Sequence, residues 1–178
     1  YPAGVGSLAL IASDLNGDGK PDLATASATD VTVLLNQGDG TFLAVVSYPA
    51  GGRPRSLIIE DLDGDGSPEL ATANLYSGDV SVLVNQGDGT FGDAVSYPVG
   101  QLPTFVIAAD LNNDGRPDLA TANGCLCERG VPATVSVLFN KGGGAFQGAS
   151  SYRVGGVPRS LVAADLNDPP HLAVPFER

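Results

Sequence analysis

A short acidic motif recurs along the 178-residue chain, and this repeat constrains the fold more than any other feature. The motif reads Asp-Leu-Asn-Gly-Asp-Gly-Lys-Pro-Asp-Leu-Ala-Thr from Asp14, and close variants begin at Asp61 and Asp110. A degraded copy begins at Asp165, so the successive spacings are 47, 49 and 55 residues. A second marker, Asn-Gln-Gly-Asp-Gly-Thr-Phe or a variant of it, begins at Asn36, Asn85 and Asn140 and so recurs in phase with the first. A period of this length indicates stacked copies of one structural unit.

Within a unit the apolar residues alternate with period two, as in Val31, Val33 and Leu35, and no stretch carries a helical apolar stripe. Gly-Asp-Gly sequences separate the apolar segments, which is typical of tight hairpins. The first unit therefore predicts four short strands near residues 7–12, 23–27, 31–36 and 41–48. Four strands in each period predict an all-β fold, a β-propeller-type array of four-stranded antiparallel blades.

The repeat divides the chain into about three and a half blades. We expect blade 1 at 1–47, blade 2 at 48–96, blade 3 at 97–151 with an insertion at 124–132, and a partial blade 4 at 152–178. The partial blade is predicted to have two strands, near 160–164 and 172–175. Propellers close with about four to eight blades, so the array is expected to be incomplete, either as a processed or excised fragment of a longer propeller or as a chain completed by oligomerisation.

The three intact acidic loops have the pattern of calcium sites. Oxygen-bearing side chains occupy positions 1, 3, 5 and 9 of each loop, a glycine at position 6 permits a sharp turn, and position 7 is expected to offer its backbone carbonyl. Threonine at position 12 and flanking strands exclude an EF-hand, and Mg²⁺ seldom takes an all-protein cage. The alternative is that Asp and Asn serve only as turn residues. The predicted ligands are Asp14, Asn16, Asp18, Lys20 and Asp22; Asp61, Asp63, Asp65, Ser67 and Glu69; and Asp110, Asn112, Asp114, Arg116 and Asp118.

The fourth copy of the loop departs from this pattern. It is two residues shorter between Asp165 and Leu172, proline replaces the turn glycine, and His171 takes the place of the position-9 acid. We therefore predict that this loop binds no calcium and that His171 is an incidental loop residue.

The composition excludes several classes of partner. Acidic residues outnumber basic ones 20 to 9, the net charge is −11, and no basic cluster is present, which argues against nucleic-acid binding. No apolar run is long enough to span a bilayer. With only one histidine in the chain, Cys125 and Cys127 cannot complete a zinc site within one molecule, so the pair is either a short-loop disulfide or two free thiols. A disulfide would indicate an oxidising compartment.

The two markers together resemble those of the FG-GAP/VCBS repeats, the calcium-binding blades of integrin-α-like propellers common in bacterial extracellular proteins. The name-giving Phe-Gly is kept at Phe91-Gly92 and changed at Phe42-Leu43 and Phe146-Gln147. The resemblance implies a rigid propeller stabilised by calcium, located outside the cell or on its surface, that serves adhesion or ligand binding.

A catalytic role has little support, because the chain offers neither a Ser-His-Asp set nor a Cys-His pair, and the paired carboxylates suit metal binding. We therefore expect a non-catalytic adhesion or assembly scaffold for a protein or glycan ligand. The alternatives are a lectin-like propeller and the propeller part of a polysaccharide-processing enzyme. The insertion at 124–132 is a natural place for specific contacts.

The aromatic residues divide into two groups. One group recurs with the repeat and is predicted to pack between blades; it comprises Tyr48, Tyr97, Tyr152, Phe42, Phe91 and Phe146. Tyr76 and Phe105 stand outside the repeat, so they are the candidates for exposed ligand contacts.

Overall fold

The computed structural model describes residues 6, 8–124, 132–165 and 170–173, and within these ranges all regular structure is β. Three four-stranded antiparallel sheets follow one another along the chain. The first contains β1 (Ala9–Ser13), β2 (Asp22–Ala26), β3 (Asp30–Leu34) and β4 (Val46–Pro49); the second contains β5 (Pro54–Glu60), β6 (Glu69–Asn74), β7 (Asp79–Leu83) and β8 (Val95–Pro98).

The third sheet repeats this plan with a small addition. It contains β9 (Pro103–Ala109), β10 (Asp118–Asn123), β11 (Thr134–Leu138) and β14 (Ser150–Arg153), and the hairpin between its last two strands carries the ribbon of β12 (Asn140–Gly142) and β13 (Ala145–Phe146). Two further strands, β15 (Val162–Asp165) and β16 (Pro170–Ala173), form a separate antiparallel pair. The prediction of an all-β array of about three and a half four-stranded blades is confirmed.

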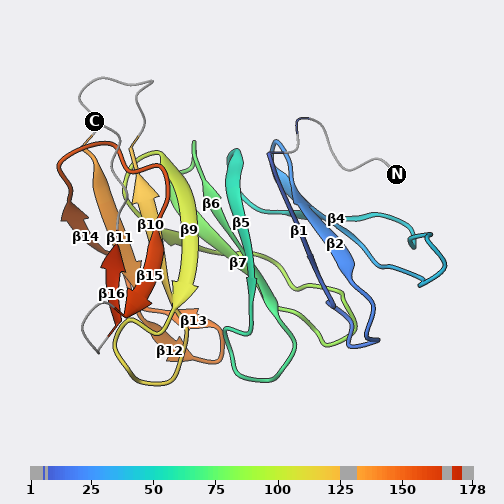
Figure 1. Ribbon diagram of the computed structural model, residues 1–178. Helices are drawn as coiled ribbons and strands as arrows, with labels where there is room; N and C mark the ends of the chain where they lie inside the picture. The colour runs from blue at the N-terminus through green and yellow to red at the C-terminus, as the bar shows by residue number, and fades with distance from the viewer. Residues whose placement is uncertain (1–5, 7, 125–131, 166–169, 174–178) are drawn as a thin grey trace.

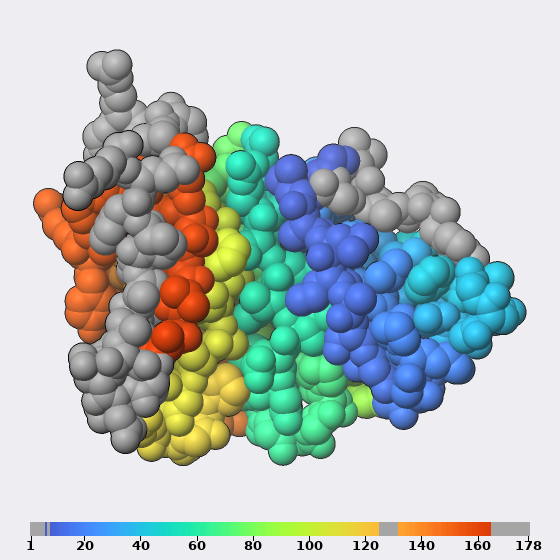
Figure 2. All heavy atoms as spheres, viewed as in Figure 1, coloured from blue at the N-terminus to red at the C-terminus, as the bar shows by residue number. Residues whose placement is uncertain are grey.

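In the described part of the chain the sheets stand side by side in an open row (Figure 1). Their first strands β1, β5, β9 and β15 contact one another in that order. In the space-filling view the first three sheets lie directly against one another (Figure 2). The buried apolar residues form three clusters, one at each junction between successive sheets. The core is therefore located between the blades, because each sheet buries its faces only against its neighbours.

The blade boundaries differ slightly from those expected. The outermost strands β4, β8 and β14 end at Pro49, Pro98 and Arg153, so the expected boundaries at 47/48, 96/97 and 151/152 fall inside them. The Tyr-Pro pair closes one sheet instead of opening the next. The reason is pairing: Tyr48 lies opposite Val31, and Tyr97 lies opposite Val80.

The repeated aromatic residues join one sheet to the next. Tyr48 meets Phe91 edge to face with ring centroids 5.5 Å apart, and Tyr97 meets Phe146 in the same way at 5.4 Å. The prediction of blade packing is confirmed for these pairs. It is wrong for Tyr152, which is 57% exposed. Tyr152 lies on the outer strand β14, and the part of the following sheet that the structure describes has only the strands β15 and β16.

One apolar position is exposed in the first sheet and buried in each of the later sheets. Leu57, Val106 and Leu161 stand four residues before Asp61, Asp110 and Asp165, and all three are buried against the preceding sheet. Leu10 holds the same position before Asp14 but is 65% exposed.

Candidate functional site

The three acidic loops connect the first and second strands of each complete sheet. They lie along the lower edge of the row of sheets in Figure 1. The fourth residue of each loop has a left-handed backbone, which glycine adopts most easily. Gly17 and Gly64 meet this requirement with φ of 74° and 85°. The third loop uses Asn113 at φ 59°, and asparagine is among the few other residues that tolerate this region.

The first aspartate of each loop organises the turn through backbone amides. Asp61 accepts hydrogen bonds from the N–H groups of Gly64 (2.7 Å) and Gly66 (3.1 Å). In the third loop the N–H of Gly115 donates to Asp110 at 2.8 Å, and such bonds lower the pKa of the Asp110 carboxyl. Each loop is thus turned around a carboxylate.

The middle loop brings three carboxylates together. Asp61, Asp63 and Asp65 each present an oxygen within 4.8 Å of the other two, and elsewhere in the described part of the chain no three acids, cysteines or histidines approach so closely. Two of the three are half-buried and Asp65 is exposed. Such a set of oxygen donors fits a hard divalent cation such as Ca²⁺.

The first and third loops differ because the side chain at position 7 is basic. Lys20 Nζ lies 3.1 Å from Asp18 Oδ2, and Arg116 Nη2 lies 2.5 Å from Asp114 Oδ2. The remaining predicted ligands, Asn16 and Asn112, accept from the backbone N–H two residues ahead. In these two loops a cation of the chain itself partly balances the acids.

The position-9 acids, predicted as metal ligands, are fully buried and hold loops to strands. Asp22 accepts from the N–H of Leu15 (2.9 Å) and of Asn36 (2.7 Å). In the third sheet Asp118 accepts from the N–H of Leu111 (3.1 Å) and of Asn140 (2.8 Å). These hydrogen bonds tie each acidic loop to the hairpin that follows the third strand.

Glu69 is the corresponding acid of the middle loop. Its Oε2 accepts from the N–H of Leu62 at 2.7 Å and its Oε1 from the N–H of Asn85 at 3.4 Å. Burial raises the pKa of Glu69 to about 7, and the hydrogen bond from Leu62 opposes that shift. Burial also raises the pKa of Asp118.

A contact that the sequence analysis missed joins the first and middle acidic loops to the sheet that follows each of them. Asn85 Nδ2 donates to the carbonyl of Leu15 (2.9 Å), and Asn140 Nδ2 donates to the carbonyl of Leu62 (2.8 Å). The signal was present, because this asparagine opens the second marker of every repeat. The two markers of successive repeats therefore contact each other across the first two blade junctions.

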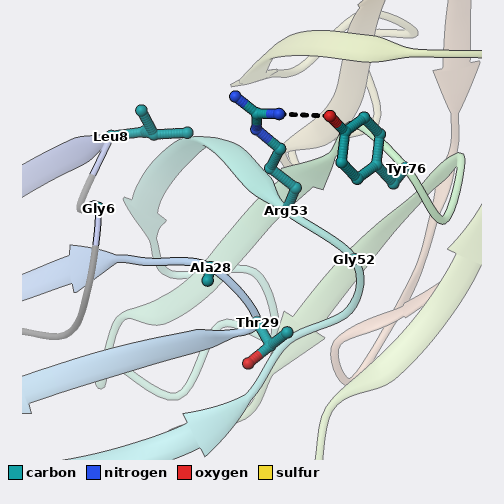
Figure 3. Close-up of a pocket in the computed structure, with 7 residues that line it drawn as sticks. All are labelled: Gly6, Leu8, Ala28, Thr29, Gly52, Arg53 and Tyr76. Carbon is teal, nitrogen blue, oxygen red and sulfur yellow. Dashed lines mark hydrogen bonds between the residues drawn. The ribbon is translucent and has the colours of Figure 1, made fainter.

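A separate cavity of about 510 Å³ lies at the junction of the first two sheets. It is lined by Gly6, Leu8, Ala28, Thr29, Gly52, Arg53 and Tyr76 (Figure 3). Tyr76 is 66% exposed, as predicted. The same prediction is wrong for Phe105, which is partly buried and packs against the apolar cluster between the third and fourth sheets.

Some predictions lie outside the described residues. These concern Cys125, Cys127, most of the insertion and residues 166–169 of the fourth loop. His171 is described only as the backbone partner of Ala164. Among the described residues, no helix has the length and apolar character needed to cross a membrane.

Comparison with known proteins supports the repeat assignment. The model of the FG-GAP-like repeat family matches residues 14–72 and 61–121. No curated protein matches the chain. One similar solved structure is described as the basis of specific recognition of non-reducing terminal N-acetylglucosamine by an Agrocybe aegerita lectin, with 23% identity, a TM-score of 0.54, and coverage of 80% of this chain and 37% of the lectin.

A second similar structure is that of BBS1N in complex with ARL6DN. It shares 14% identity and a TM-score of 0.59 over 94% of this chain and 45% of that one. The chain therefore spans less than half the length of either structure. At these identities the likeness concerns the fold alone.

Proposed function

Because the chain belongs to the family of FG-GAP-like repeats, we propose that it is a calcium-binding, non-catalytic scaffold for adhesion or ligand binding, secreted or displayed at the cell surface. The observation that carries the calcium proposal is the group of three carboxylates in the middle loop. Three like charges at this separation repel one another, and a bound divalent cation would relieve the repulsion.

In the middle loop Asp61, Asp63 and Asp65 would hold the ion, with the backbone carbonyl of Ser67. The first and third loops would bind through the equivalent residues, but Lys20 and Arg116 would first have to leave their carboxylate partners. The bound ion would add positive charge to an acidic loop and would stiffen the edge of the array that the loops form.

The test is thermal unfolding of the chain in saturating Ca²⁺ and in EGTA, with Mg²⁺ as a control. A ligand at 100 times its Kd stabilises the folded state by about 2.7 kcal/mol per site. For a chain of this size we expect a rise in Tm of about 5 to 10 °C from one saturated site. Equal Tm values in Ca²⁺ and EGTA would refute the calcium proposal.

Exposed apolar residues at both ends of the row support a role in assembly. Leu10 and Tyr152 are uncovered, whereas their equivalents in the other sheets contact a neighbouring sheet. We propose that another sheet of the same type packs on these faces, supplied by a second copy of the chain or by a longer array. Light scattering with and without Ca²⁺ measures this: a monomer under both conditions excludes the second copy.

Carbohydrate binding is the second candidate function. It is favoured by the fold shared with a lectin and by an exposed tyrosine beside a cavity. A further alternative is a supporting role within a polysaccharide-processing enzyme, which would show as calcium-dependent cleavage of an acidic polysaccharide. A glycan array separates the lectin from the protein adhesin.

A further inference from the structure

The cavity between the first and second sheets combines an apolar wall with a few polar groups. Leu8 and Ala28 supply apolar surface, and Thr29, Arg53 and Tyr76 supply a hydroxyl, a guanidinium and an aromatic ring with its hydroxyl (Figure 3). Small-molecule sites have this character, because apolar surface supplies affinity and a few placed polar groups fix orientation.

Arg53 and Tyr76 depart from the repeat. Tyr76 stands seven residues after Glu69, where the first repeat has Thr29 and the third has Cys125. Arg53 precedes the proline that opens its sheet, and Leu102 has this place in the next repeat with a similar φ, 53° against 57°. The backbone at this position thus belongs to the repeat and accepts other side chains. The stacking of the sheets does not explain why Arg53 and Tyr76 are present together.

The two residues contact each other at the cavity. Arg53 Nη1 donates a hydrogen bond to the Tyr76 hydroxyl, and the guanidinium carbon lies 5.1 Å from the centroid of the tyrosine ring. This contact holds the guanidinium beside an aromatic ring that is still exposed to solvent, and it engages only one of the five N–H donors of an arginine.

The charge of Arg53 has no acidic partner among the described residues, although the chain has 20 acidic residues and only 9 basic ones. Asp79, the first residue of β7, follows Tyr76 closely in the sequence, but its carboxylate accepts hydrogen bonds from Asn74, Ser77 and Ser96. The acidic loops lie at the opposite end of the sheets (Figure 1). Their repulsion of an anion is weak there, since charges are screened over about 8 Å at physiological ionic strength.

From these observations we propose that the cavity binds an acidic saccharide, a sugar unit that carries a carboxylate. The guanidinium of Arg53 would take the carboxylate through paired N–H donors, a geometry that arginine matches and lysine does not. The ring of Tyr76 would pack against the apolar face of the sugar, and the Thr29 hydroxyl would hydrogen-bond to a ring hydroxyl. This inference rests on the ligand-binding function proposed above and names its ligand class.

The experiment is calorimetric titration of the chain with trigalacturonate and with neutral galactotriose, at one fixed Ca²⁺ concentration. We expect binding of the acidic trisaccharide and at least tenfold weaker binding of the neutral one. Arg53→Gln should lower the affinity for trigalacturonate at least tenfold and remove the preference for the acid. Tyr76→Ala should weaken both ligands, whereas Tyr76→Phe should keep most of the affinity.

Arg55→Gln is the matched control, since Arg55 is an exposed arginine of β5 outside the cavity lining and its loss changes the net charge equally. It should leave the affinity unchanged. Equal affinity for the two trisaccharides, equal losses in the Arg53 and Arg55 variants, or no binding of trigalacturonate at millimolar concentration would each overturn the inference. The effect of Ca²⁺ on Tm, measured on the same samples, shows separately whether the calcium proposal stands.

Discussion

The middle acidic loop and its two neighbours share one motif and one place in their sheets, yet they differ in how their charge is balanced. In the first and third loops the side chain at position 7 is Lys20 or Arg116, which pairs with the position-5 aspartate. In the middle loop that position is Ser67, and three carboxylates converge. One residue outside the side-chain ligand pattern thus distinguishes loops whose acids are partly balanced by a basic side chain from a loop in which three carboxylates converge without one.

The largest expected effect concerns Glu69, the buried acid beneath the middle loop. Glu69→Ala would leave the buried N–H groups of Leu62 and Asn85 without their acceptor. An unsatisfied buried amide costs about 1 to 3 kcal/mol, so we expect a loss of about 3 kcal/mol in the free energy of unfolding, measured by urea denaturation in EGTA.

The control is Asp65→Ala, because Asp65 is exposed and belongs to the convergent group of the same loop. In EGTA this variant should be nearly as stable as the unmodified chain. If the two substitutions cost the same, the separation between a structural role for position 9 and the proposed metal-binding role for position 5 is wrong.

The next effect is a dependence of stability on pH. The pKa of Glu69 is raised from its ordinary 4.5 to about 7, so between these values the folded chain binds more protons than the unfolded chain. The stability of the calcium-free chain should therefore fall as the pH rises from about 4.5 to about 7, by at most about 1.4 kcal/mol per pH unit. Asp118 acts in the same direction.

Urea denaturation in EGTA across this pH range measures the slope. Glu69→Gln should flatten it, because the amide does not titrate. Stability that rises with pH in the unmodified chain, relative to this variant, would contradict the expectation.

The comparison between loops is tested directly by exchanging position 7. Ser67→Lys should weaken Ca²⁺ binding at the middle loop about tenfold, because a partly exposed cation beside the site costs about 1.4 kcal/mol. Lys20→Ser should strengthen the first loop by a similar factor. Calorimetric titration with Ca²⁺ measures both changes.

Lys141→Ser serves as the control for these exchanges, since Lys141 is an exposed lysine outside the acidic loops. An equal gain in this variant would mean that net charge, and not the contact between Lys20 and Asp18, sets the affinity.

The smallest effect is expected from Asn140→Ala, which removes the hydrogen bond to the carbonyl of Leu62 across the blade junction. The affinity of the middle loop for Ca²⁺ should fall a few-fold, because one neutral hydrogen bond contributes about 1 kcal/mol. Asn36→Ala is the matched variant, because both asparagines also donate a hydrogen bond within their own repeat. Asn36 Nδ2 donates to the carbonyl of Pro21, and Asn140 Nδ2 donates to the carbonyl of Pro117. If both variants weaken the middle loop equally, the junction contact has no part in its affinity.

The fold could be predicted from the sequence because its two markers are local and periodic. The alternation of Val31 and Val33 and the turn glycines act within a few residues, so the first three strands of the first unit lie close to the predicted ranges. The prediction for the fourth strand, 41–48, is wrong at its start, because β4 begins only at Val46. The exposure of Tyr152 could not be predicted in this way, because Tyr48 and Tyr97 are covered by Phe91 and Phe146 of the following repeat, beyond the range of a local pattern.

The candidate site was predictable in part. Oxygen spacing identified Asp61, Asp63 and Asp65 as a group, and the structure brings them together. The role of Glu69 depends on the amide of Asn85, 16 residues away, and the ion pair of Lys20 depends on the direction of a long side chain. Residue spacing alone predicts neither the contact between Glu69 and Asn85 nor the direction of the Lys20 side chain. The pairing of Arg53 with Tyr76 joins two residues 23 positions apart that no repeat predicts.

The asparagines that span the first two blade junctions also set an order of events during synthesis. Leu15 and Leu62 receive their partners from residues 70 and 78 positions later in the chain. During synthesis, therefore, an acidic loop emerges well before the side chain that completes it. The first and second repeats each receive this hydrogen bond from their successor, so folding should advance along the chain as a front that trails the ribosome by about one and a half repeats. Shortening the chain from its C-terminal side would then remove the hydrogen bond to the last completed loop each time a junction asparagine is lost.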